Sequence, residues 1–186
     1  NRDGSYLMTN SNNGTSWTIS GTKVFGIAID GIAAVAILQS GAGYTGTLPA
    51  RLSDSYYYVY LGVGSGEPSG GLADIYLARV PKASIGTKAS YEYYNGTPPT
   101  ESWTSSLGSK TSVFNDPNKF ELHPTITYWP ALDKFIMMSA HSTSKLGIFE
   151  SDNPWGPWAT LYYGDFRDSY WKFLYQGVQK WMGGGA

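Results

Sequence analysis

The sequence predicts an all-β fold, and three observations support this prediction. Short runs rich in β-branched and aromatic residues recur along the 186 residues, separated by clusters of Gly, Pro, Asn, Asp and Ser. Aromatic residues make up 16% of the chain and there are 23 Gly, a mixture that favours strands and tight turns. Helical periodicity is confined to residues 82–93, where Pro81 and Gly86 argue against a long helix.

Ten strands are expected from these runs. They cover residues 6–9, 17–20, 24–29, 33–39, 56–63, 74–80, 125–128, 134–140, 146–150 and 158–163. The segment 131–134 (ALDK) predicts a hairpin turn between the two strands that flank it.

A repeated unit favours a β-propeller over a sandwich or a barrel. Residues 11–18 (SNNGTSWT) and 151–158 (SDNPWGPW) each place a polar turn and a Trp between two expected strands. Stacked propeller blades produce such a unit, because every blade reuses one hairpin and one packing Trp. We therefore expect about three antiparallel blades within a single domain, residues 1–186, that is incomplete at both ends, with Trp158 packed between blades.

Composition and charge exclude several classes of protein. Charged residues make up 15% of the chain and the net charge is −1, so the basic stripe that nucleic-acid binding requires is missing. Cysteine is absent, which excludes disulfides and thiolate chemistry. The longest apolar stretch, residues 27–38, is interrupted by Asp30 and Gly31 and is too short to span a bilayer, so we expect no membrane partner.

Motifs in a fixed order carry a resemblance to a known family. They are the segments 75–81 (IYLARVP) and 91–96 (YEYYNG), Trp103, and the segments 123–128 (HPTITY), 146–150 (LGIFE), 154–158 (PWGPW) and 180–182 (KWM). In this ordered set the sequence is similar to a family of glycoside-hydrolase-like five-bladed β-propellers, long carried as a domain of unknown function, some relatives of which are arabinan-cleaving enzymes. The segment 11–18 also resembles a degenerate Asp-box of sialidase-type propellers, in which Asn12 replaces the usual Asp.

The resemblance implies a secreted, extracellular propeller with a carbohydrate site at one end of its central channel. It also implies that N-terminal blades, which this sequence lacks, carry part of the carboxylate machinery of enzymatic relatives. A partial ring exposes strand edges that invite pairing with other chains. We therefore expect a second chain or copy to complete the sheet edges.

Candidate catalytic carboxylates are those that border apolar strands, because glycoside hydrolysis uses two carboxylates. They are Asp30, Asp74 and Glu150. A strand-end carboxylate beside apolar groups can have the raised pKa that a general acid requires. The alternative for each is a turn carboxylate that accepts hydrogen bonds from nearby backbone N–H groups.

The two histidines of the chain, His123 and His141, flank two strands that are expected to pair. If those strands form a hairpin, both side chains lie at the same end of it. Such a pair could act as acid and base, contact sugar hydroxyls or bind a structural or catalytic divalent cation, so the cofactor stays open at this point. The alternative is two histidines that bond to surface loops.

Candidate substrate-binding residues are Arg79, which could clamp a carboxylate-bearing sugar, and aromatic side chains that could stack on sugar rings. The aromatic candidates are Trp103, Tyr128 and Trp129, together with Tyr44, Trp155 and Trp158. The alternative for Arg79 is an internal salt bridge with Glu92 or Asp74.

Three hypotheses for the function remain open from the sequence. The first is a glycoside hydrolase that acts on an oligo- or polysaccharide. The second is a polysaccharide lyase, in which Arg79 neutralises a uronate while His or Tyr removes a proton. The third is a glycan-binding module without catalysis.

Overall fold

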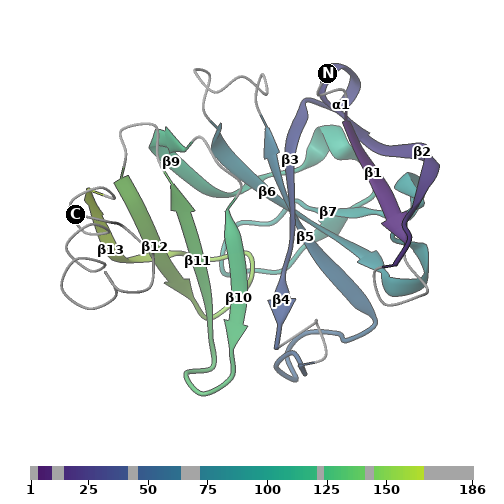
Figure 1. The fold of residues 1–186 in the computed structure, drawn as a ribbon. Coiled ribbons are helices and arrows are strands. Elements are labelled where there is room, and N and C mark those ends of the chain that lie inside the picture. The colour runs from purple at the N-terminus through teal and green to yellow at the C-terminus, as the bar shows by residue number, and fades with distance from the viewer. Residues whose placement is uncertain are drawn as a thin grey trace, which may run out of the picture.

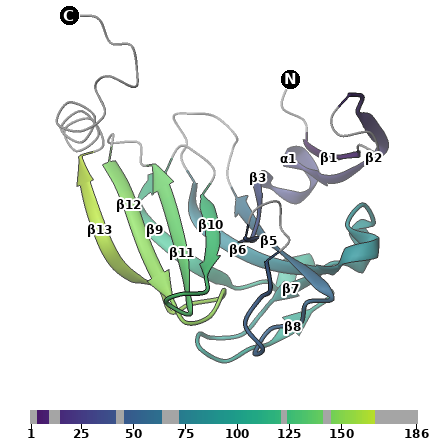
Figure 2. The same ribbon diagram turned by 60° about the horizontal axis from the view of Figure 1, so that its bottom comes forward.

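The described part of the chain folds into three mainly antiparallel β-sheets, seen from two directions in Figures 1 and 2. The computed structural model describes residues 4–9, 15–41, 46–63, 72–120, 124–140 and 145–165. Helix in these ranges amounts to one four-residue turn and three 3-10 turns of three residues each. The predictions of an all-β fold and of low helix content are therefore confirmed.

The first sheet is a two-stranded hairpin of β1 (Gly4–Thr9) and β2 (Thr18–Gly26). The strand expected over residues 24–29 ends early, because the chain turns into α1 (Ile27–Asp30). Gly31 closes this turn with a φ of 67°, and its N–H donates to the Ile27 carbonyl at 2.9 Å. A glycine adopts this left-handed conformation without strain, which explains why the apolar run breaks here.

The second sheet has the order β3-β5-β6-β7-β8, and β9 also pairs with β6. Its long strands are β3 (Ile32–Ile37), β5 (Tyr56–Val63) and β6 (Leu72–Pro81), which match three predicted strands. The outer strands were not predicted; they are β7 (Glu92–Tyr94), β8 (Trp103–Thr104) and β9 (Ser112–Phe120). The 3-10 turns lie beside them, at η2 (Lys82–Ser84), η3 (Lys88–Ser90) and η4 (Leu107–Ser109).

The third sheet has the order β13-β12-β11-β10-β4. Its strands are β4 (Gln39–Ser40), β10 (Thr125–Trp129), β11 (Lys134–Ala140), β12 (Lys145–Ser151) and β13 (Ala159–Asp165). β10 and β11 form the predicted hairpin, with Trp129 opposite Lys134 across the turn. β4 pairs in parallel with β10 and so links this sheet to the strand β3 that precedes β4 in the chain.

The main core lies between the second and third sheets. Fully buried side chains come from both, including Tyr60 and Leu77 from the second sheet and Phe135 and Met137 from the third. The Tyr60 hydroxyl donates to the Pro154 carbonyl at 2.7 Å, and burial raises the pKa of this phenol well above its ordinary value. Trp158 is partly buried and packs against the same core, and its place between propeller blades stays a prediction.

A second core covers the opposite face of the second sheet, where the β1–β2 hairpin lies against it. Phe25 from the hairpin meets Tyr91 edge to face, with ring centroids 5.0 Å apart. The second sheet is therefore buried on both faces, which explains why β5 is an almost continuous apolar run. In the described parts of the chain, no helix has the length and apolar character needed to cross a membrane.

Candidate functional site

Strands of the second and third sheets begin at one edge of the molecule, which we call the starting edge and which lies at the top of Figure 1. β3 and β6 are both antiparallel to β5, so they run in the same direction. β10 is parallel to β4, which continues along the path of β3. The starting edge is therefore defined by Ile32, Leu72 and Thr125, the first residues of β3, β6 and β10.

Asp30 lies at the starting edge, two residues before β3, in a tightly bonded position. Its carboxylate accepts a hydrogen bond from the Gly26 N–H at 2.8 Å and pairs with the Lys88 ammonium, and its side chain is only 6% exposed. Burial by itself would raise the pKa of Asp30, but the hydrogen bonds from Lys88 and Gly26 outweigh it and hold the pKa below its ordinary value. Asp30 is therefore ionised, which suits a base or a structural anchor and not a general acid.

Asp74 lies near the start of β6, at the same edge. Its carboxylate accepts a hydrogen bond from the Asn115 side-chain amide at 2.8 Å, across the β6–β9 pair. The neighbouring Ile75 points into the main core, so Asp74 points to the opposite face of the sheet, where the Lys88 segment lies. Since one strand separates β3 from β6, the two strands that position Asp30 and Asp74 are about 10 Å apart.

Glu150 lies away from these two aspartates. β12 is antiparallel to β11, which is antiparallel to β10, so β12 also runs from the starting edge. Glu150 is the last but one residue of β12 and therefore lies toward the opposite edge. The structure thus brings Asp30 and Asp74 to one edge and separates them from Glu150.

His123 and His141 lie outside the described residues. The strands that flank the pair do form the hairpin on which the prediction depends, with Thr125 opposite Met138. The proposal that the two side chains share one end of this hairpin stays a prediction.

Arg79 lies toward the far end of β6, in a stack of aromatic rings. Its guanidinium carbon is 4.8 Å from the ring centre of Tyr56 and 4.5 Å from that of Trp103. Its Nε donates to Glu92 at 2.7 Å and its Nη1 to Glu101 at 3.2 Å. The alternative of an internal salt bridge with Glu92 is therefore observed, and the cluster carries two carboxylates for one guanidinium.

The predicted aromatic platforms differ in how much of each ring solvent can reach. Trp103 is covered on one face by Arg79 and donates its indole N–H to Glu101 at 2.6 Å. Tyr128 is 8% exposed and donates its hydroxyl to Asp133 at 2.7 Å. Trp155 is 4% exposed and stacks on Tyr94, so the ring of Trp155 is closed to sugar. Trp129, at the end of β10, is 53% exposed and presents an open ring.

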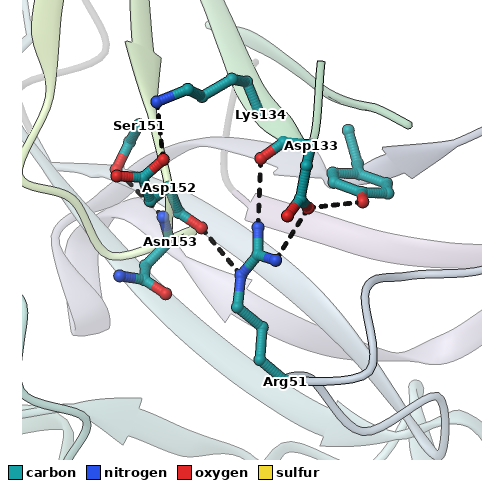
Figure 3. A network of polar contacts seen from close by, with 7 residues as sticks. Arg51, Asp133, Lys134, Ser151, Asp152 and Asn153 are labelled. Carbon is teal, nitrogen blue, oxygen red and sulfur yellow. Dashed lines mark hydrogen bonds and ion pairs between the residues drawn. The ribbon is translucent and has the colours of Figure 1, made fainter. Parts of the chain in front are cut away.

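A second polar cluster at the edge opposite to the starting edge was not predicted (Figure 3). Arg51, in the loop before β5, donates to Asp133 Oδ1 at 2.7 Å and to the Asp152 carbonyl at 2.9 Å. Lys134 pairs with the Asp152 carboxylate at 2.6 Å. The cluster connects the loop before β5 to two turns of the third sheet. We therefore interpret it as a structural contact that holds the second and third sheets together.

Metal binding has little support from the side chains that the structure describes. Among them, no group of three or more His, Cys, Asp or Glu residues could hold a metal ion. The histidines that could contribute, His123 and His141, are outside this set.

The described strands and sheets define an all-β protein. No family model and no curated protein matches the sequence. The chain is similar to a crystal structure described as a "putative hydrolase" from Bacteroides ovatus ATCC 8483, with 18% sequence identity and a TM-score of 0.42. The similarity covers 62% of this chain and 27% of that chain, so the sequence spans about a quarter of its length.

Proposed function

We propose that this protein is a secreted, carbohydrate-active protein of the glycoside-hydrolase type that acts on a polysaccharide at the starting edge. The observation that carries the proposal is the common direction of β3, β6 and β10, which brings Asp30 and Asp74 to one edge of the molecule. His123 and His141 lie outside the described residues and stay candidates from the sequence alone.

The strand spacing is close to the carboxyl separation of a hydrolytic pair. Inverting glycosidases place their two carboxyl groups about 6.5–9.5 Å apart so that a water molecule fits between them and the sugar. The strands behind Asp30 and Asp74 are about 10 Å apart, close to this range. Asp74 is partly exposed, so we assign it the position that contacts the substrate. Asp30 is ionised, so we assign it the role of a base or of a structural anchor beside Asp74.

The environment of Arg79 argues against the lyase hypothesis. A uronate clamp needs a cation with unsatisfied charge, but Glu92 and Glu101 already neutralise this guanidinium. Arg79 also lies near the end of β6, while Asp74 lies near its start. A neutral glycan is therefore the preferred substrate class.

The stacking of three sheets supports the propeller architecture that we propose for this fold. In a propeller each blade is covered on both faces by its neighbours, which is the environment of the second sheet. A second chain or copy that covers the outer face of the third sheet belongs to the same proposal.

The test is hydrolysis of a panel of neutral and uronate-containing polysaccharides, arabinan included, with detection of new reducing ends and of unsaturated ends. We expect reducing ends from a neutral glycan, and we expect Asp74→Asn to abolish their release without loss of stability. Glu150→Gln, at the other edge, is the matched control and should keep full activity. Unsaturated ends would establish the lyase instead, and glycan retention without either product would establish a binding module.

A further inference from the structure

An apolar cavity of about 110 Å³ lies between the β1–β2 hairpin and the second sheet. Its walls come from three layers of the fold: Val24 and Phe25 on β2, Val35 and Val59 on the sheet, and Tyr91 beyond η3. Leu7 from β1, Ile37 and Ile85 also line it, so every lining side chain among the described residues is aliphatic or aromatic.

Among the described residues, the side chains that line the cavity offer no polar group without a hydrogen-bond partner. The polar side chain among the described lining residues, Tyr91, donates its hydroxyl to the Ile85 carbonyl at 2.7 Å, and burial raises the pKa of Tyr91 to about 12. The phenol is therefore neutral and already bonded at any physiological pH. A water molecule is held firmly only by two to four polar partners, and the described side chains of this wall offer one hydroxyl that is already bonded.

The partly exposed aliphatic side chains in the wall mark where a guest would gain contacts. Val35 and Ile37 are β-branched residues of β3 that turn toward this face, and both remain partly exposed although the side chains around them are buried. An aliphatic side chain with no atoms packed against one of its sides lacks the dispersion contacts that it would have in a filled core. An apolar guest would restore these contacts and remove apolar surface from water.

We propose that this cavity is a binding site for a small apolar molecule, of the size of one aromatic ring or a short alkyl chain. The volume sets the size limit, because an engineered cavity of about 150 Å³ lined by Leu, Ile and Phe holds benzene. The wall chemistry sets the class, because a sugar would leave its hydroxyl groups unpaired there. The lining residues do not include Asp30 or Asp74, and the proposal does not depend on the proposed function.

Substitutions at two residues should change the volume of the cavity. A phenylalanine at Val35 would fill it, since the valine already forms part of the wall. Leu7 covers one side, and Gly86 makes room for it, because a Cβ at residue 86 would lie 2.9 Å from Leu7 Cδ2. Leu7→Ala would therefore enlarge the cavity, and Val35→Phe would close it.

The experiment titrates benzene into the intact chain and follows methyl resonances and thermal unfolding. We expect saturable shifts of the Val35 and Val59 methyl signals and a rise in Tm in the wild type. In Val35→Phe we expect binding at least tenfold weaker. Val63→Phe is the matched control, because Val63 packs on the same face without lining the cavity, and it should bind like the wild type.

A wild type without saturable shifts would overturn the proposal, as would equal binding by Val35→Phe. If Val35→Phe does not fold, nuclear Overhauser contacts between benzene and the Val59 methyl groups in the wild type decide the question. Contacts to Val59 support the site, and their absence at saturation refutes it.

Discussion

Arg51 Nη1 lies 2.7 Å from Asp133 Oδ1, and this contact joins the loop before β5 to the turn between β10 and β11. The same guanidinium donates to the carbonyls of Asp133 and Asp152, and it lies over the Phe135 ring at 5.6 Å. One side chain of the second sheet therefore contacts two turns of the third sheet (Figure 3).

We predict that Arg51→Ala lowers the midpoint of thermal unfolding by about 2–4 °C. The reason is the loss of three hydrogen bonds that hold the two sheets together at this edge. Arg51→Lys should recover less than half of the loss, because an ammonium cannot reach the three acceptors in the planar geometry of a guanidinium. Calorimetry measures the shift. A midpoint unchanged within about 1 °C in Arg51→Ala would show that the Arg51 contacts contribute nothing measurable to stability.

The lowered pKa of Asp30 predicts how the stability of the protein depends on pH. Its pKa in the folded protein is below the ordinary value of 3.8, so the unfolded state binds the proton more readily. The stabilising contribution of Asp30 is therefore fully present above the ordinary pKa and is lost as the pH falls through the lowered value.

We predict that Asp30→Asn lowers the free energy of unfolding by about 1–2 kcal/mol at neutral pH, and that the difference from wild type shrinks below the ordinary pKa. Urea denaturation at neutral pH and in acid measures both values. Asp54→Asn is the control, since Asp54 is an exposed loop residue with one long contact of 3.4 Å, to the Leu48 N–H. A difference that stays constant across the pH range would mean that the Asp30 carboxylate is not responsible.

The long strands could be predicted from the sequence because local pattern determines them. β5 and β11 have the bounds that were predicted, and in both a run of apolar and aromatic residues lies between clear turn signals. β9 was missed because it contains Asn115, Asp116 and Pro117, residue types that favour turns. Its pairing with β6 is a tertiary contact that overrides local propensity.

The candidate site could be predicted only in part. Asp30 and Asp74 stand out in the sequence because they border apolar runs, and strand polarity then shows that they share an edge. The pairing of Asp74 with Asn115 and of Asp30 with Lys88 depends on how distant segments meet, which spacing along the chain does not reveal. Arg51 has no local signal at all, since its partners lie in turns of another sheet.

We predict that substitutions of the two tryptophans in the segment 154–158 change stability by different amounts. Trp155 is buried, stacks on Tyr94 and donates its indole N–H to the Pro99 carbonyl at 2.8 Å, so Trp155→Ala should cost about 3–5 kcal/mol. The indole N–H of Trp158 is buried and finds no acceptor among the described residues. Trp158→Phe should therefore change stability by less than about 1 kcal/mol, and a loss as large as that of Trp155→Ala would contradict this assignment.

The outer face of the third sheet carries a row of apolar side chains. Met138, Ile148 and Tyr162 lie opposite one another on β11, β12 and β13. Their neighbours Met137 and Phe149 point into the main core, so the row points away from it. Met138 is 42% exposed and Tyr162 37% exposed. An apolar patch of this kind on a sheet favours association with another chain.

We predict that a second copy of the chain covers this face, so that the protein self-associates at micromolar concentration. The double variant Met138→Lys/Tyr162→Lys should shift the population to monomer, because two ammonium groups would have to be desolvated in the contact. Leu132→Lys is the control, since Leu132 is 55% exposed but lies in the β10–β11 turn away from the row, and it should associate like the wild type. Light scattering gives the mass of each variant over a concentration series, and a wild type that stays monomeric throughout the series would refute the prediction.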